Sequence, residues 1–171
     1  MKSRSCPPRP NDYPVAARDR ASLEVYFGAA NVMPLASENP DDVLLIVDKK
    51  KERQVWVRPS NAREDRTQFE RYRQAYEAVH GPVSNDYDVD HVQSQKRAGQ
   101  NEYRYVRLCR LKREVNQAWG RRWEGRLVRA GNQLGWTERD GPPPIRQIDQ
   151  FQWWKVQGLM PGETPYGAKA T

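Results

Sequence analysis

Residues 85–127 read NDYDVDHVQSQKRAGQNEYRYVRLCRLKREVNQAWGRRWEGRL, and this stretch decides the fold. Two runs rich in β-branched and aromatic residues, 87–92 and 103–111, predict strands on either side of a polar loop. A helix is predicted over 112–131, because apolar side chains recur there every fourth residue: Val115, Trp119, Trp123 and Leu127. Gly131 suits the end of that helix. The predicted order is therefore strand, loop, strand, helix.

The sequence on either side of this stretch predicts the rest of an α+β fold. Residues 41–48 and 53–60 are β-rich runs joined by KKKE, which indicates a hairpin with a charged turn. Apolar and aromatic residues at helical spacing predict a helix over 63–79, and Gly81 followed by proline ends it. The apolar run 148–154 is expected to pack back on the domain.

Length and composition favour one domain with an appendage. The chain has 171 residues, of which 37% are hydrophobic and 30% charged. We expect residues 1–20 to be a proline- and arginine-rich lead or linker and residues 21–171 to form a single domain. Cys6 and Cys109 lie far apart and form no CxxC motif, so a structural zinc site is not expected. Free thiols are the favoured state of the two cysteines, with a disulfide between them as the alternative.

The charge of the chain indicates anionic partners. The formal net charge is +7 and the isoelectric point is about 9.6, a balance that favours nucleic acid, an anionic membrane or an acidic protein. No apolar run approaches 18 residues, so no membrane span is expected. The first residues hold no hydrophobic segment of the secretory type. The chain is therefore expected to act in the cytoplasm, or to be exported without a cleaved signal.

One set of residues in the central stretch combines groups that phosphodiester hydrolysis needs. His91 closes the first predicted strand, and an imidazole with an ordinary pKa near 6.5 suits a general base. Asp90 and Asn116 carry oxygen ligands of the kind that Mg²⁺ prefers, and this ion needs only one or two of them. Arg107 or Arg110, both on the second strand, could meet transition-state charge, and Arg107 is the one chosen as catalytic. Asp88 shares a strand face with Asp90, so the two carboxylates either share a cation or are solvated.

Each of these residues also has a structural interpretation. His91 would then be a hydrogen-bonded structural histidine, and Asp90 would orient the neighbouring backbone or an arginine. Glu124 follows Asn116 by eight residues, just over two helical turns, so both lie along one side of the predicted helix with Gly120 between them. Gly120 costs roughly 1 kcal/mol relative to alanine, which either close approach of a phosphate or close packing of a strand would explain. Glu124 could equally be an ion-pair partner of nearby arginines.

The pattern of Asp90-His91, Asn116 and Glu124 resembles the His-Me finger endonuclease superfamily, also called HNH-like or ββα-metal. The resemblance implies a ββα-metal core at about 85–130 within a nuclease-like domain. It implies that His91 is the base, that Asp90 and Asn116 hold Mg²⁺ (or Mn²⁺), and that Glu124 holds metal-bound water. Two features depart from the family: DRGH is replaced by DVDH, and no histidine follows His91.

Basic residues surround the proposed site. From Lys96 to Arg129 there are eleven lysines and arginines against three glutamates, a density that indicates contact with a phosphate backbone. The residues expected to bind nucleic acid are Lys96, Arg97, Arg110, Lys112, Arg113, Arg121 and Arg122. No element that would read bases is apparent, so little sequence specificity is expected. DNA is the expected substrate, with RNA as the alternative.

The setting of such a nuclease follows from a second resemblance. A small basic chain with a proline-rich lead is similar to the C-terminal toxin domains of bacterial polymorphic toxins, delivered by contact-dependent or type VI secretion. This implies an acidic immunity protein as partner. Two alternatives remain: a non-catalytic basic module that binds nucleic acid or protein on a degenerate HNH-like scaffold, and a recombination nuclease of a phage or mobile element.

Overall fold

The computed structural model describes residues 9–35, 39–59, 66–120 and 142–161. Its strands are β1 (Pro14–Ala17), β2 (Val32–Pro34), β3 (Val43–Val47), β4 (Arg53–Val57), β5 (Tyr87–His91), β6 (Tyr105–Lys112) and β7 (Ile145–Gln147). Its helices are α1 (Arg20–Phe27), α2 (Arg66–His80), α3 (Gln95–Gln100), α4 (Arg113–Trp119) and α6 (Gln150–Val156), with a 3-10 turn η1 (Ala29–Asn31). The predicted α+β class is confirmed.

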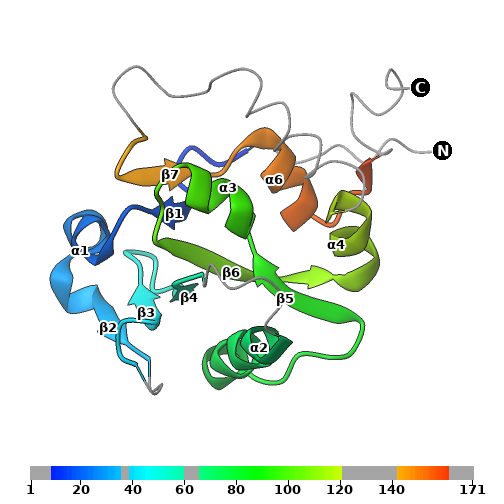
Figure 1. Cartoon of the computed structure of the whole chain (residues 1–171), viewed down its shortest axis with the longest axis horizontal. Helices are drawn as coiled ribbons and strands as arrows, with labels where there is room; N and C mark the ends of the chain where they lie inside the picture. The colour runs from blue at the N-terminus through cyan, green and yellow to red at the C-terminus, as the bar shows by residue number, and fades with distance from the viewer. Residues whose placement is uncertain (1–8, 36–38, 60–65, 121–141, 162–171) are drawn as a thin grey trace.

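The strands form one curled antiparallel sheet (Figure 1). The strand order is β2-β3-β4-β6-β1-β7, and β5 pairs with β6 outside this path. Helix α2 covers one face of the sheet, whereas α4 and α6 contact the other face around β5 and β6. Helix α1 lies beside β1, β2 and β7.

Strand β6 holds the sheet together because its two halves have different partners. In the first half, Val106 pairs with Val57 of β4 and with Ala16 of β1. The second half pairs with β5, in a register that sets His91 opposite Leu108 and Asp90 opposite Cys109. Since β4 pairs with β6 through only two residues, the two strands separate beyond Arg107.

The core is divided between the two faces of the sheet. Under α2, one cluster includes Val57, Tyr72, Val79, Val89 and Leu108. Under α6, a second includes Val15, Val92, Leu111 and Ile148. A third lies around α1, where Leu23 and Phe27 pack with Trp56 and Tyr105. Burial of these side chains is the main favourable contribution to folding.

The predicted hairpin and the predicted central order are both confirmed. β3 and β4 pair in register, and the Asp48 carboxylate accepts hydrogen bonds from the backbone N–H groups of Lys50 and Glu52 at 2.8 and 2.9 Å. Lys51 completes the turn in the left-handed region, with φ of 65°. Strands β5 and β6 and helix α4 follow in the predicted order. The predicted helix continued to residue 131, but residues 121–141 lie outside the described part of the chain.

Two predicted irregular segments contain regular structure. Residues 14–17 of the predicted lead form β1, which is fully buried and pairs with both β6 and β7. A strand this short and uniformly apolar has no alternation by which it could be recognised. The predicted loop between β5 and β6 contains α3, whose N-terminal Ser94 side chain accepts a hydrogen bond from the Arg97 N–H. The run 148–154 packs on the domain through α6, as expected.

Two expectations from composition can be compared with the described residues. Cys109 is a buried free thiol, whereas Cys6 lies outside the described ranges. None of the helices in those ranges combines the length and the apolar character that crossing a bilayer requires.

Helix α1 offers a matched test of the core, because Leu23 is fully buried and Val25 is 88% exposed. We expect Leu23→Ala to lower the free energy of unfolding by about 2–5 kcal/mol, and Val25→Ala to change it by at most about 0.5 kcal/mol. Urea unfolding followed by tryptophan fluorescence measures both. Equal effects of the two substitutions would contradict the placement of α1.

Candidate functional site

The alternation of side chains along β5 divides the predicted site between two faces of the sheet. Asp88 and Asp90 lie on the face covered by α4 and α6, where Asp88 contacts α4 and Asp90 contacts Lys155 of α6. Val89 and His91 lie on the face covered by α2. Successive residues of a strand must point to opposite faces. His91 therefore points away from Asp88, and it approaches Asp90 only because the two residues are neighbours at the end of the strand.

Asn116 lies next to Asp88. The Asn116 Nδ2 donates to Asp88 Oδ2 at 3.2 Å, and the Arg113 Nε donates to Asp88 Oδ1 at 3.0 Å. Helix α4 begins directly after β6, and the Arg113 N–H bonds to the carbonyl of Asp86 just before β5. This junction places the first turn of α4 over the start of β5. Asn116 and Asp90 were predicted to share a metal ion, and the amide contacts Asp88, which lies on the same face of β5 as Asp90.

Two residues contact the Asp90 carboxylate: His91, which donates a hydrogen bond to it, and Lys155, which carries a positive charge. Its Oδ1 accepts the backbone N–H of His91 at 2.8 Å and lies 3.5 Å from Nδ1 of the same residue. Its Oδ2 lies 3.7 Å from Nζ of Lys155. Burial by itself raises the pKa of the Asp90 carboxyl, but the hydrogen bonds from His91 and the Lys155 charge together lower that pKa below its ordinary value. Asp90 is therefore a carboxylate at neutral pH.

Lys155 is a residue of the site that the sequence did not reveal. Its side chain is only 5% exposed, although lysine is rarely buried without a partner. Helix α6 is fixed by a capping box in which Asp149 and Gln152 exchange side-chain and backbone hydrogen bonds. The helix thereby carries the ammonium group to Asp90. No short-range pattern in the sequence links Lys155 to that aspartate.

His91 is enclosed rather than open to solvent. The residue is 4% exposed, and its ring meets the Tyr72 ring edge-on, with centroids 5.1 Å apart. Its Nε2 is buried and has no hydrogen-bond partner among the described residues. A buried polar atom without a partner costs free energy, and such atoms are uncommon enough in proteins to require an explanation.

The donor set on β5 and α4 suits a hard divalent cation held by few protein atoms. Two carboxylates and one amide oxygen are ligands that Mg²⁺ accepts, and the ion keeps several of its waters. Asp88 and Asn116 are already adjacent, whereas Asp90 is balanced by Lys155. Within the described ranges, no three His, Cys, Asp or Glu side chains are grouped so that they could hold a metal. Glu124, the other predicted ligand, lies outside these ranges.

The predicted nucleic-acid-binding residues that the structure describes have different surroundings. Arg97 pairs with Asp149 at 3.1 Å, and Arg113 pairs with Asp88. Lys96 and Lys112 are exposed on α3 and at the end of β6. Arg110 packs over the Tyr87 ring, 4.7 Å from its centroid. Arg121 and Arg122 lie outside the described part of the chain.

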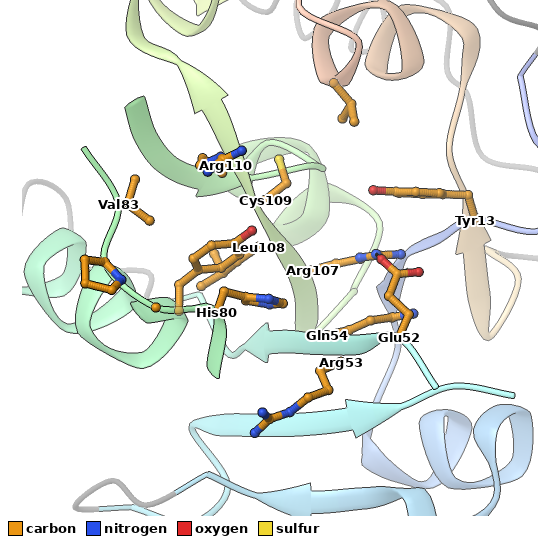
Figure 2. A pocket seen from close by; sticks show the side chains of 14 residues that line it. Tyr13, Glu52, Arg53, Gln54, His80, Val83, Arg107, Leu108, Cys109 and Arg110 are labelled. Atoms are coloured by element: carbon orange, nitrogen blue, oxygen red, sulfur yellow. Dashed lines mark hydrogen bonds and ion pairs between the residues drawn. The ribbon is translucent and has the colours of Figure 1, made fainter. Parts of the chain in front are cut away.

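A cleft of about 410 Å³ opens where β4 and β6 separate. Figure 2 shows the side chains that line it, which come from β4 and the turn before it, from β6, from the end of α2 and the segment after it, from the segment before β1, and from α6. Arg107, predicted to act in catalysis, belongs to this cleft and not to the β5–α4 site. Its guanidinium lies 4.2 Å from the Tyr13 ring centroid and 2.6 Å from Glu52 Oε1. Cys109 also lines the cleft, but burial raises the pKa of its thiol to about 12, so it stays protonated.

His80 is the second histidine of the chain and lies in the cleft. It ends α2, and its ring lies against the Tyr76 ring with centroids 4.3 Å apart. Partial burial lowers the pKa of His80 first, and the positive charge of Arg53 lowers it further. The sequence contains no spacing pattern that joins His80 to Arg53 and Arg107, because each comes from a different element.

Comparison with known proteins does not assign the chain to a family. No family model, curated protein or solved structure matches the chain. A function is therefore inferred from the residues of the β5–α4 site and of the cleft beside β6.

The Asp90 interactions predict how stability depends on pH. A carboxyl whose pKa is lowered by folding stabilises the protein above its unfolded pKa, which is about 4, and the stabilisation is lost as the pH falls through the folded pKa. We expect Asp90→Asn to lower the free energy of unfolding at pH 7 by about 1–3 kcal/mol. The difference from the wild type should shrink below about pH 4. Asp86→Asn, an exposed carboxyl just before β5, is the control. A constant difference from pH 7 to pH 3 in urea unfolding would contradict the assignment.

Proposed function

We propose that this chain is a metal-dependent endonuclease that hydrolyses phosphodiester bonds of DNA, with β5, β6 and α4 acting as a ββα-metal core. The observation that carries the proposal is a pair of contacts made by neighbouring residues of β5. The Asp90 carboxylate touches His91, and on the same face of β5 the Asp88 carboxylate is bonded to Asn116 of the following helix. A base next to hard oxygen ligands is what metal-assisted hydrolysis requires.

His91 acts as the general base in this proposal. The Asp90 carboxylate beside Nδ1 favours the tautomer with its proton on Nδ1, which leaves Nε2 able to accept a proton from water. Nε2 has no hydrogen-bond partner among the described residues, which is expected of an atom that accepts a proton from a reacting water molecule. Because Nε2 is buried, this role requires that water reach it through a local movement around His91.

The oxygens of Asp88 and Asn116, with Asp90 as a further ligand, would hold Mg²⁺ (or Mn²⁺). Such an ion supplies a Lewis acid for the scissile phosphate. Lys155 has a separate role, since its charge adds to the hydrogen bonds from His91 in lowering the pKa of Asp90. The amide of Asn116 orients Asp88, and Arg113 shares that carboxylate from the other side.

The substrate and setting are part of the same proposal. A net charge of +7 favours a polyanion, and without an element that reads bases the cutting is expected to have little sequence specificity. DNA is the proposed substrate, and RNA is tested beside it. The biological role is proposed to be that of an antibacterial toxin effector that acts in the cytoplasm of a target cell, reached by secretion without a cleaved signal. Its partner would be an acidic immunity protein.

A non-catalytic module is the second candidate, and one observation favours it. His91 is enclosed and Asp90 is already paired with a buried lysine. In a protein that only binds nucleic acid or an acidic partner, these residues would be structural. The two candidates differ in whether cutting depends on metal and on the β5–α4 residues.

Plasmid nicking by the purified chain tests the proposal. With Mg²⁺ or Mn²⁺ we expect nicking that EDTA abolishes and that Asn116→Ala and His91→Phe each reduce by at least about 100-fold. The control Gln117→Ala, an exposed neighbour on α4, should cut like the wild type. Phenylalanine preserves the ring that packs on Tyr72, so thermal unfolding should show His91→Phe folded. A parallel assay on single-stranded RNA measures the preference between substrates.

Two results would overturn the nuclease. One is intact plasmid and intact RNA under conditions in which a known nuclease cuts both. The other is nicking that is unchanged in His91→Phe and Asn116→Ala, since this would come from a contaminant or another site. Binding without cutting, weakened by salt, would favour the non-catalytic module.

A further inference from the structure

We propose that the cleft between β4 and β6 is a second phosphate-binding site, which holds a backbone phosphate of a nucleic-acid strand away from the β5–α4 junction. The inference deepens the proposed function, because it names how the substrate strand is held. The cleft itself is argued from its own residues and can exist without catalysis.

The cleft lies on the edge of β6 opposite to β5. The carbonyl of Arg107 accepts the N–H of Val92, at the end of β5. Tyr76, which lines the cleft, instead lies beside the backbone N–H of Arg110. Backbone groups of successive strand residues point to alternate edges, so residues 107 and 110 face opposite sides. A strand that contacts both the cleft and β5 must therefore cross β6.

The charges that line the cleft favour an anion. Arg53, Arg107 and Arg110 line it, against the single carboxylate of Glu52. Glu52 is committed to Arg107. Within the described ranges, neither Arg53 nor Arg110 has a carboxylate at ion-pairing distance. Neither guanidinium is neutralised by a carboxylate, and guanidinium groups suit phosphate oxygens in particular. Arg110 packs over the Tyr87 ring, and Figure 2 shows the Arg53 side chain directed away from Arg107 and Arg110.

The form of the cleft suits a nucleotide unit better than a small free ion. Its volume of about 410 Å³ is in the range of small-molecule sites. Figure 2 shows Arg110 and Arg107 at separate places along the lining, with His80 between β4 and the end of α2. The basic groups are therefore spread along the cleft and do not converge on one point. Tyr13 and Tyr76 add aromatic side chains, and burial raises the pKa of Tyr13 to about 12, so it stays a neutral phenol.

The pKa of His80 should change when an anion binds in this cleft. Burial lowers its pKa, and so do Arg53, Arg107 and Arg110, while Glu52 raises it. The carboxyl end of α2 also favours the protonated ring. A phosphate that enters among the arginines opposes their repulsion and stabilises the imidazolium. Occupation of the cleft should therefore raise the pKa of His80.

The test uses proton NMR of the imidazole signals, since the chain has only two histidines. In EDTA, without divalent metal, a thymidine dinucleotide with one phosphodiester is titrated into the full chain, with inorganic phosphate and a mononucleotide as parallel probes. We expect a saturable shift of the His80 signal, a raised His80 pKa in the bound state, and no shift of His91. Sodium chloride at matched ionic strength should leave His80 unmoved.

Variants assign the effect to the cleft. Arg53→Gln and Arg110→Gln should each weaken dinucleotide binding about tenfold, whereas Arg71→Gln should not. Arg71 is an exposed arginine on the same helix as His80 and lies 3.8 Å from Asp42. The Arg71→Gln substitution therefore removes the same charge as the cleft variants, but outside the cleft. Loss of binding in Arg71→Gln equal to that in the cleft variants would reduce the effect to net charge and overturn the site.

The outcomes separate this inference from the proposed nuclease. Dinucleotide binding at the cleft in a protein that cuts nothing would leave the cleft standing and overturn the nuclease. Nicking that depends on His91, with no His80 shift for any probe, would overturn the cleft and keep the nuclease. Inorganic phosphate bound as tightly as the dinucleotide would overturn the strand-holding role, because the site would then recognise a free phosphate.

Discussion

The structure depends on β6 and on the way its two halves divide their partners. The first half is central in the sheet, between β4 and β1, and the second half pairs with β5 alone. A strand with different neighbours along its length must lose one partner where it gains another, and β6 makes this change between Arg107 and Leu108. Both edges of β6 beyond this point contribute to a candidate site. The paired edge carries the β5–α4 junction, and the edge that β4 leaves becomes a wall of the cleft.

Electrostatic balance at the β5–α4 junction links the fold to its proposed chemistry. Asp88 and Asp90 are carboxylates on the same face of one strand, an arrangement that repulsion opposes unless cations offset it. Arg113 and Lys155 supply that offset, from the helix after β6 and from α6. Lysine burial at this position is costly, so the Lys155–Asp90 contact is stable only because α6 is packed by its own tryptophans and by its capping box. Removing the α6 packing would therefore disturb Asp90 from a distance.

Local patterns were sufficient for much of the framework. The β3–β4 hairpin, α2 and the order β5, β6, α4 follow from periodicity and turn residues, which act over a few positions. The buried β1 was missed because a central strand of four residues has no alternation, and its burial depends on β6 and β7. The candidate site was only partly predictable for the same reason. Asp88, Asp90 and Asn116 do share a face, but whether Asn116 meets Asp88 or Asp90 is set by the angle between α4 and the sheet.

The sequence by itself determined the α+β class, the strand, strand, helix order, the basic character and the set of side chains suited to phosphodiester chemistry. Those properties depend on composition and on spacing along the chain. Only the tertiary structure decided that Lys155 balances Asp90, that Tyr72 encloses His91, and that Arg107 belongs with His80 in a separate cleft. These contacts join segments distant in sequence. Their geometry comes from strand pairing and helix packing, which no local pattern of residues encodes.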